Sequence, residues 1–481
     1  MQLNNQLLLK NQCLVDGQWI DNSLDRIEVL NPATGELVEK VPRLTEQQIL
    51  LAINAASRAL EEWRYCSAQD KSQLLKKWHD LIIANELDLA QIMSNEQGKP
   101  LEEAVGEIRY GASYIEWFLE EAKRIEGEII SHANGHKTFI TKEPIGVCAL
   151  ITPWNFPNAM LARKMAPALA AGCTVVIKPS EQTPLSALAL VELATIAGFP
   201  RGVINIITGD SEKIGGLLTS NPLIRKLSFT GSVRVGETLK SQCIATHKST
   251  SMELGGNAPF IVFEDAKLEA TIDGLLHAKF RNTGQTCVAA NRILVQKRLY
   301  PTLVEALKVK ISQLVIGDPY QQDVKLGPLI NKEAVNRIEE WVQEAISQGA
   351  ELIVGGRKPE LGPCFYGATL LTGVTPKMRL FQEEIFGPVL ALTPFETEEE
   401  ALQLANQTEA GLAAYLFTSN LTRIAKLTER LRFGMIGVNT GIISYASIPF
   451  GGTKYSGEGR EGSRYGINEY LEIKCTTISA D

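Results

Sequence analysis

Histidine and closely spaced cysteines are scarce in this 481-residue chain. It has five histidines, and no two of its eight cysteines form a C-x-x-C pair. Structural zinc sites need clusters of these residues, and disulfide-stapled domains need regular cysteine frameworks. Scattered thiols in a long chain are typical of a reducing compartment. The sequence therefore predicts no metal site, and we expect the protein to be cytoplasmic.

The sequence also lacks an excess of positive charge and a long apolar run. Its net charge of −7 argues against a nucleic-acid-binding surface. No apolar run reaches the roughly 18 residues that a membrane span needs. The three-leucine run near the amino terminus is too short for the apolar region of a signal peptide. We therefore expect no nucleic-acid partner and no membrane partner.

What the chain does contain is a globular composition and a repeated strand–helix alternation. Apolar residues make up 44% and charged residues 21%, as in soluble globular proteins. From Pro144 onward the short apolar runs "IGVCALIT", "TVVIK" and "VINIIT" alternate with helical patterns that end at Gly172 and Gly198. A second alternation follows after about residue 254. This rhythm predicts an α/β fold with parallel sheets that are covered on both faces.

One thiol stands out from the other seven. The segment "FRNTGQTCVAANR", Phe280 to Arg292, places Cys287 in a short polar loop between a helical run and an apolar strand. Cysteine usually behaves as a small buried hydrophobe, whereas a reactive cysteine acts as a thiolate. Cys287 is therefore either a core residue or a nucleophile.

Three loops that follow predicted strands carry polar side chains. In "TPWNFP" the amide of Asn155 can donate to an oxyanion or simply satisfy the turn backbone. In "MELGGNAPF" Glu253 is a candidate general base, although a lone carboxylate is more often a surface charge. In "IKPSEQTP" Lys178 ends a buried strand, where ligands of open α/β sheets bind, and Glu181 follows it. Such a Lys–Glu pair is by itself more often a solvated surface pair.

Two glycine-rich segments are candidate phosphate loops. In "FTGSVRVG", Gly231 allows a tight turn and Ser232 lies at a predicted helix start, which attracts anions. Its spacing is not the ordinary dinucleotide fingerprint. The segment "GEGREG", 457–462, matches G-x-G-x-x-G but lacks the strand before it and the helix after it that the fingerprint requires. A flexible turn is the favoured reading of this second segment.

Seven motifs in order resemble the NAD(P)-dependent aldehyde dehydrogenase superfamily. They are "TPWNFP", "KPSEQTP", "FTGS", "MELGGNAPF", "FRNTGQTC", "EEIFGPV" and "PFGGTKYSGEGREG", and they cover roughly residues 15–475. Within the superfamily, "FRNTGQTC", "IGVNTGIIS" and "GREGSRYGINEYLEIK" are similar to the succinate-semialdehyde dehydrogenases. The resemblance implies that Cys287 attacks the aldehyde, that Asn155 and the Cys287 backbone N–H hold the resulting oxyanion, and that Glu253 activates the water that hydrolyses the thioester.

The resemblance also implies a nicotinamide cofactor. The positions that match the cofactor-binding residues of the family are Trp154, Lys178, Gly231, Ser232, Glu384 and Phe386, with Glu384 at the nicotinamide ribose. Glu181 would accept hydrogen bonds from the other ribose and would repel the 2′-phosphate of NADP. We therefore expect NAD as the preferred cofactor, with NADP possible. The "GEGREG" segment then becomes a structural part of the family's carboxyl-terminal region.

For the substrate, the resemblance implies that Arg163, Arg281 and Ser444 bind the far carboxylate of succinate semialdehyde. The alternative is that both arginines are solvated charges on helix faces. Glutarate semialdehyde stays open as a substrate because one methylene is worth only about 1–3 kcal/mol, and so does a less selective aldehyde oxidation. Glu253 argues against CoA as the acyl acceptor, and the complete set of Asn155, Glu253 and Cys287 argues against a purely structural role.

The resemblance implies three structural parts. They are a Rossmann-like cofactor domain at 1–119 and 143–254 with a return near 441–459, a catalytic α/β domain at 255–440, and a small β oligomerisation flap at 120–142 and 460–481. "GEIISHANGHKTFITKE" fits a hairpin around Asn134-Gly135. Because an isolated hairpin is marginally stable, we expect it to pair with another subunit in a homodimer or homotetramer.

Overall fold

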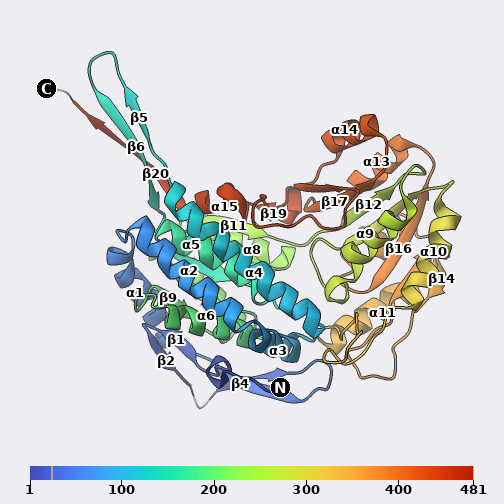
Figure 1. The fold of residues 1–481 in the computed structure, drawn as a ribbon, viewed down its shortest axis with the longest axis horizontal. Coiled ribbons are helices and arrows are strands. Elements are labelled where there is room, and N and C mark those ends of the chain that lie inside the picture. The colour runs from blue at the N-terminus through green and yellow to red at the C-terminus, as the bar shows by residue number, and fades with distance from the viewer. Residues whose placement is uncertain (23–24, 480–481) are drawn as a thin grey trace.

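A computed structural model describes residues 1–22 and 25–479 of the chain. Two α/β halves lie side by side, and a narrow three-stranded sheet projects from the amino-terminal half (Figure 1). The predicted range 460–481 ends with two residues, 480 and 481, that lie outside the described residues, as do 23 and 24 of the range 1–119. The predicted α/β class, with parallel strands in both large sheets, is confirmed.

The amino-terminal half is built on an eight-stranded sheet with the order β19-β11-β10-β7-β8-β9-β1-β2. Its strands are β1 (Cys13–Val15), β2 (Gln18–Ile20), β7 (Val147–Ile151), β8 (Thr174–Lys178), β9 (Ile204–Ile206), β10 (Ile224–Thr230), β11 (Ser249–Glu253) and β19 (Gly457–Glu458). The five central strands are parallel, as predicted. The edges are antiparallel, because Asp16 and Gly17, both at positive φ, make a two-residue hairpin turn and β19 returns from the carboxyl-terminal region.

Helices cover both faces of this sheet. One face packs against helices α2 (Ala68–Ala84), α3 (Glu86–Gln97), α4 (Leu101–Glu121), α5 (Ala159–Ala171) and α6 (Pro184–Ala197). The other face packs against α1 (Glu46–Trp63), α7 (Ser211–Ser220) and α8 (Val233–Ile244). Helix α5 is buried along its whole length because it lies between the sheet and two further helices. The capping box predicted at the start of α1, with Thr45 and Gln48, is present.

The second half is built on a seven-stranded sheet with the order β14-β15-β16-β13-β12-β17-β18. Its strands are β12 (Ala258–Val262), β13 (Ala290–Gln296), β14 (Glu351–Val354), β15 (Thr369–Thr372), β16 (Val389–Phe395), β17 (Ala413–Phe417) and β18 (Met435–Val438). All are parallel except β14. Its helices are α9 (Leu268–Phe280), α10 (Tyr300–Ser312), α11 (Lys332–Ser347), α12 (Arg379–Gln382), α13 (Glu398–Asn406) and α14 (Leu421–Arg430). The apolar runs "PFIVF", "RILVQ", "ELIVGG", "VLALTPF", "AAYLFT" and "MIGVN" predict six of these strands from the sequence, but β15 was missed.

The projecting sheet joins two distant segments of the chain. Its order is β20-β6-β5, with β5 (Glu128–Ser131), β6 (Lys137–Pro144) and β20 (Leu471–Ile478). The predicted hairpin is present, with Gly135 at positive φ in the turn between β5 and β6. Strand β20 then pairs with β6 over its full length, as Figure 1 shows at the upper left. Strand β6 continues two residues past the predicted boundary at 142.

The remaining regular elements are small. Strands β3 (Arg26–Leu30) and β4 (Leu37–Pro42) form a separate two-stranded sheet, and the short helix α15 (Ser463–Asn468) precedes β20. Within residues 1–22 and 25–479, no helix is both long and apolar enough to cross a membrane.

Candidate active site

The order of the first sheet creates a place for a ligand. Strands β7 and β10 are neighbours, but β8 and β9 continue from β7 in one direction and β11 continues from β10 in the other. In open α/β sheets, ligands bind outside the carboxyl ends of the strands at such a switch point. Here the loop after β7 carries Trp154 and Asn155, and the loop after β10 carries Gly231 and Ser232. Glu253 is the last residue of β11, the next strand.

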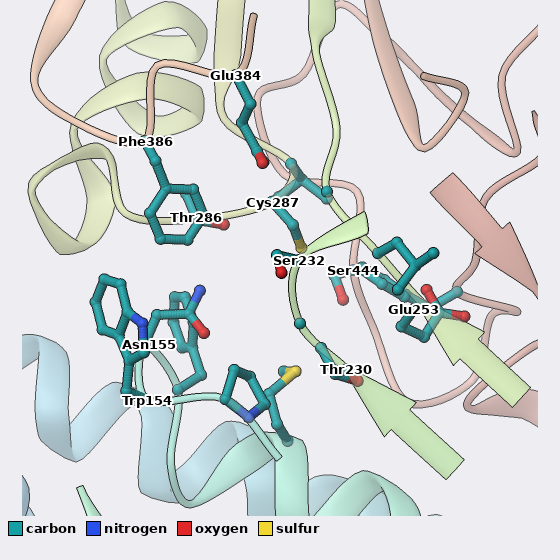
Figure 2. A pocket seen from close by; sticks show the side chains of 18 of the residues that line it. Trp154, Asn155, Thr230, Ser232, Glu253, Thr286, Cys287, Glu384, Phe386 and Ser444 are labelled. Atoms are coloured by element: carbon teal, nitrogen blue, oxygen red, sulfur yellow. The ribbon is translucent and has the colours of Figure 1, made fainter. Parts of the chain in front are cut away.

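The second half contributes residues from the opposite strand ends. Cys287 precedes β13, and Glu384 and Phe386 precede β16. Residues of both halves line one cavity of about 280 Å³, into which the sulfur of Cys287 points in Figure 2. The cavity brings together most of the residues predicted from the sequence: Trp154, Asn155, Arg163, Gly231, Ser232, Glu253, Arg281, Cys287, Glu384, Phe386 and Ser444. Lys178 and Glu181 do not line it.

The loop that presents Cys287 has an unusual backbone. Asn282 and Thr283 both have positive φ, at 51° and 55°, a conformation that costs energy for residues other than glycine. Gly284, at φ 78°, lies so close to the second half that an added Cβ would be 2.3 Å from the Gly387 carbonyl oxygen. The loop is therefore held by its surroundings in one shape. It leaves Cys287 only partly buried, which favours the nucleophile over the core residue.

The surroundings of Cys287 keep its thiol protonated. Burial, followed by the negative charges of Glu384 and Glu253, raises the pKa of Cys287 to about 12, although Arg163 opposes the shift. A thiolate, not a thiol, attacks carbonyl carbon. The Cys287 thiol therefore needs a base or a change of nearby charge before it can act as a nucleophile.

Asn155 is positioned beside the nucleophile loop. Its side-chain Nδ2 donates to the backbone carbonyl of Gln285 at 2.9 Å, and the residue is buried. In Figure 2 the nitrogen end of the amide is the end turned toward the side of the cavity where Cys287 lies. Asn155 and Cys287 therefore line the same cavity, and Asn155 is held against the loop that presents the thiol.

The environment of Glu253 is that of a candidate general base. It is buried, and its Oε2 has no hydrogen-bond partner among the residues that the structure describes. Burial and then the charge of Glu461 raise its pKa well above the ordinary value, while Arg163 opposes the shift. A carboxylate whose pKa lies closer to neutrality is a more effective general base. Glu253 also lines the cavity.

Arg163 is not a solvated charge on a helix face, and that alternative from the sequence is wrong. It is 1% exposed on α5. Its Nη2 lies 2.7 Å from Glu461 Oε2, and its guanidinium packs over the rings of Tyr114 and Phe450. Lys164 donates to the other oxygen of Glu461 at 2.6 Å. The helix buries its arginine because Glu461 supplies the compensating charge.

Arg281 and Ser444 line the same cavity as Arg163. Arg281 packs against the ring of Phe156. Ser444 forms a hydrogen bond with the hydroxyl of Tyr110, which also accepts from Arg163 Nη1 at 3.3 Å. Tyr110 was not predicted from the sequence, because a tyrosine in the middle of a helix carries no local sign of its partners. Two of the cavity's polar groups, Arg163 and Ser444, are thus linked through one phenol.

The residues predicted to bind a cofactor fall into two groups. Trp154 and Phe386 meet edge to face at 5.5 Å, and Glu384 Oε1 accepts a hydrogen bond from Gly256 N at 3.0 Å. Burial raises the pKa of Glu384 to about 7. Ser232 is the N-cap of α8.

Lys178 and Glu181 form the second group, outside the cavity. Lys178 Nζ donates to Glu181 Oε2 at 2.9 Å and to Ser211 Oγ at 2.5 Å. Ser211 Oγ in turn donates to Glu181 at 2.8 Å. Burial opposes the charge on Glu181, but Lys178 lowers its pKa below the ordinary value. Ser211, which was not predicted, completes a charged cluster at the carboxyl end of β8.

These residues fit a nicotinamide dinucleotide. The N-terminus of α8 attracts phosphate groups. At Gly231, which precedes it, an added Cβ would lie 2.4 Å from the ring of Phe229, so the backbone approach there depends on glycine. Carboxylates at Glu181 and Glu384 can accept from ribose hydroxyls.

The "GEGREG" segment is not a phosphate loop. Gly457 and Glu458 form the edge strand β19 against β11, and Gly457 pairs with Glu253. An added Cβ at Gly457 would lie 1.8 Å from the Met252 carbonyl oxygen. The segment is structural, as the family resemblance implied, but it also delivers Glu461 to Arg163 and Lys164. A charged residue inside a glycine-rich segment was the one sign of this in the sequence.

A comparison with known proteins decides the family. The family model described as "Aldehyde dehydrogenase family" matches residues 19–476. This chain belongs to the aldehyde dehydrogenase family. It is 50% identical over 480 residues to a succinate-semialdehyde dehydrogenase (NADP(+)), GabD, of Escherichia coli, covering 99% of this chain and 100% of that protein.

Two further family members extend the comparison. A glutarate-semialdehyde dehydrogenase of Pseudomonas aeruginosa is 49% identical over 476 residues, covering 98% of this chain and 99% of that protein. The crystal structure of an aldehyde dehydrogenase from Brucella melitensis biovar abortus 2308 superimposes with a TM-score of 0.99 at 50% identity and covers 100% of both chains. The family uses NAD(P), so the predicted oxidoreductase class is confirmed. No group of three or more His, Cys, Asp or Glu side chains within the described ranges has the arrangement of a metal site.

Proposed function

We propose that this aldehyde dehydrogenase oxidises succinate semialdehyde to succinate with NAD as the preferred cofactor. One observation carries the proposal. The cavity that holds Cys287, Asn155 and Glu253 is also lined by Arg163, Arg281 and Ser444. An aldehyde that carries a carboxylate at its far end has a partner for each end in this cavity.

The chain's own residues would carry the chemistry as follows. Cys287 loses its proton to water in the cavity and its sulfur bonds to the aldehyde carbon, while Asn155 donates to the oxyanion of the thiohemiacetal. Loss of a hydride from that carbon re-forms the carbonyl and leaves a thioester on Cys287. A nicotinamide cofactor, when bound, supplies the acceptor for the hydride. Glu253 then takes a proton from water, which attacks the thioester carbon and releases succinate and the Cys287 thiol. The unpaired Glu253 Oε2 supports this last role.

Arg163 retains donors for a substrate even though it is paired with Glu461. Its Nε makes no hydrogen bond within the described part of the chain. A buried guanidinium with an unused N–H group costs energy that a bound carboxylate would recover. Arg163 can therefore bind a substrate carboxylate while it stays paired with Glu461.

The preference for NAD rests on Glu181. Lys178 and Ser211 hold this carboxylate in its ionised form at the carboxyl end of β8. A 2′-phosphate about 4 Å away would meet a repulsion on the order of 4 kcal/mol at an effective dielectric constant near 20. The Escherichia coli relative carries NADP(+) in its name, so the preference has to be tested on this chain.

We expect Glu181→Ser to raise the ratio of kcat/KM with NADP to kcat/KM with NAD by at least tenfold, because the like charge is removed. The neighbouring Gln182→Ser is the control and should leave the ratio unchanged. If Glu181→Ser leaves it unchanged too, Glu181 does not select the cofactor.

Glutarate semialdehyde is the second candidate substrate, because the Pseudomonas aeruginosa relative is named for it. The deciding measurement is kcat/KM for succinate semialdehyde, glutarate semialdehyde and butanal, each with NAD and NADP. We expect both carboxylated substrates to exceed butanal by at least 100-fold, with succinate semialdehyde the better of the two. Equal use of butanal would contradict the carboxylate clamp and leave an unselective aldehyde dehydrogenase.

We also propose the division into a cofactor domain, a catalytic domain and a flap at the ranges given above, and a homodimer or homotetramer built through the flap. The flap supports this assembly because it exposes Ile129, Ile130, Ile473 and Ile478 on its two faces. Apolar side chains on a projecting sheet favour a partner surface. The cytoplasmic location stays a prediction.

A further inference from the structure

Lys99 is a buried lysine that does not line the active-site cavity. It lies in the short loop between α3 and α4 and is 2% exposed. Its Nζ donates to Glu107 and, at 2.9 Å, to the backbone carbonyl oxygen of Asn155. It also packs 4.0 Å from the centre of the Phe156 ring. A buried ion pair rarely adds net stability compared with apolar residues, so this one calls for another explanation.

The carbonyl oxygen of Asn155 also accepts a hydrogen bond from the other half of the molecule. Asn282 Nδ2 donates to Asn155 O at 2.9 Å. Asn282 belongs to the positive-φ loop that presents Cys287, and its backbone N donates to Glu103 of α4 at 2.8 Å. Gln97 Nε2 donates to Asn282 Oδ1 at 2.9 Å. Asn155 O is therefore one of the points where the first half and the nucleophile loop are joined.

Glu107 fixes the other end of the same segment. Its Oε1 accepts from the backbone N of Asn158 and of Ala159, each at 3.0 Å, at the start of α5. Its Oε2 is the partner of Lys99. The Lys99–Glu107 pair thus holds residues 155–159 at both ends, and the Asn155 side chain leaves from the first of them. An error of about 1 Å in the position of a catalytic donor can cost on the order of 100-fold in rate.

We propose that Lys99 is a positioning residue that sets the Asn155 amide for the oxyanion of the Cys287 adduct. The proposal rests on the proposed function, since it takes Asn155 to be the oxyanion donor. Lys99 does not line the cavity, so it acts through Asn155 and not on the substrate. Its ammonium is suited to this because it bridges a backbone carbonyl and a carboxylate that no neutral side chain of similar length would join.

The test compares Lys99→Met, Asn155→Ala and the double variant in the first turnover, where the burst of NADH reports acylation of Cys287. We expect Lys99→Met to slow the burst at least tenfold with little change in the KM for aldehyde. In the Asn155→Ala background, the same change should cost less than threefold, because the amide it positions is gone. Lys226→Met, which removes a different fully buried lysine, should change the burst less than twofold.

A purely structural role would give a different pattern. Alkylation of Cys287 by iodoacetamide needs no oxyanion donor, so its rate should stay within twofold of wild type in Lys99→Met. Lys99→Arg, which keeps the charge and the donors, should recover at least part of the burst rate. If Lys99→Met does not fold, the same comparison of single and double variants is made with Lys99→Arg. Its smaller loss of burst rate should likewise disappear in the Asn155→Ala background.

Two results would overturn the proposal. In the first, Lys99→Met slows the burst by the same factor in the Asn155→Ala background as in wild type. In the second, Lys99→Met slows the alkylation of Cys287 by iodoacetamide as much as it slows the burst. A wild-type enzyme that reduces neither NAD nor NADP with any aldehyde would instead overturn the proposed function. The two failures are therefore distinguishable.

Discussion

At the scale of single residues, the site is governed by negative charges that face a thiol. Glu384 and Glu253 both disfavour the thiolate of Cys287, and burial adds to their effect. The pKa of Glu384 is itself raised to about 7 by burial. Since the charge on Glu384 appears as the pH rises through about 7, the opposition to the thiolate grows over the same range.

Glu384→Gln should therefore activate the thiol in a pH-dependent way. Above pH 7, removal of the charge lowers the pKa of Cys287, and alkylation by iodoacetamide should be faster than in wild type by about three- to tenfold at pH 8. At pH 6, where Glu384 is already protonated, the two rates should converge. The adjacent Glu383→Gln is the control and should match wild type throughout. Equal rates for Glu384→Gln and wild type at pH 8 would refute the electrostatic account.

Tyr110 should matter only for substrates with a carboxylate. Its hydroxyl contacts both Arg163 and Ser444, so Tyr110→Phe leaves two groups of the clamp without a shared partner. A hydrogen bond to a charged group contributes about 1.5–3 kcal/mol, so kcat/KM for succinate semialdehyde should fall roughly 10- to 100-fold. The value for butanal should change less than twofold. Tyr366→Phe, which removes a buried hydroxyl without a hydrogen-bond partner in the described residues, should affect neither.

Some residues of the site could be predicted from the sequence, but the contacts between distant residues could not. Cys287, Asn155 and Glu253 stand out because polar side chains in loops beside apolar strands leave a local trace. The pairing of Lys164 with Glu461 spans 297 positions, and nothing near either residue encodes it. The same holds for the contact of Tyr110 with Ser444. Long-range pairs are set by how the two halves meet, which local pattern does not specify.

At the scale of elements, strands with clear boundaries were the predictable ones. The run "TVVIK" became β8 with the same limits because Gly172 and Pro179 bracket it. Strand β15 was missed although β14 and β18 are equally short, because its run "TLLT" has only two apolar residues, and neither of these leucines is β-branched. The antiparallel edges were missed as well, since an edge strand needs only a short return and no crossover helix.

The pairing of β19 with β11 offers a prediction for an element. Because an added Cβ at Gly457 would collide with the Met252 carbonyl, Gly457→Ala should push β19 off β11 and move Glu253. We expect the apparent Tm to fall by a few degrees and steady-state turnover to drop at least tenfold, with acyl-enzyme accumulating. Gly106→Ala, at an exposed helix position with nothing within 4 Å, should instead stabilise slightly, by about 0.5–1 kcal/mol. Unchanged turnover in Gly457→Ala would show that β19 does not hold Glu253.

At the scale of the whole molecule, the site lies between two separately packed halves. Each sheet has its own apolar clusters on its two faces. The first sheet offers the carboxyl ends of its strands, and the second offers the loops before β13 and β16. The sequence predicted both halves, because each follows from its own alternation. It did not predict which strand ends would face each other.

The flap gives the prediction that belongs to this scale. Ile473 is 71% exposed on β20, so Ile473→Lys should weaken contact with another subunit. We expect sedimentation velocity to show a smaller species than wild type at the same concentration. Leu421→Lys is the matched control, because Leu421 is 80% exposed on α14, away from the flap. A monomeric wild-type protein would contradict assembly through the flap altogether.

The course of β20 also bears on how the protein is handled in the laboratory. The last described strand runs outward along β6, so its end at Ile478 lies at the outer end of the flap, while the amino terminus lies on the opposite side of the molecule (Figure 1). An affinity tag fused after residue 481 would sit beside the surface that we assign to a second subunit. A tag at the amino terminus would leave that surface clear, and preparations made in the two ways should differ in apparent mass if the assignment is right.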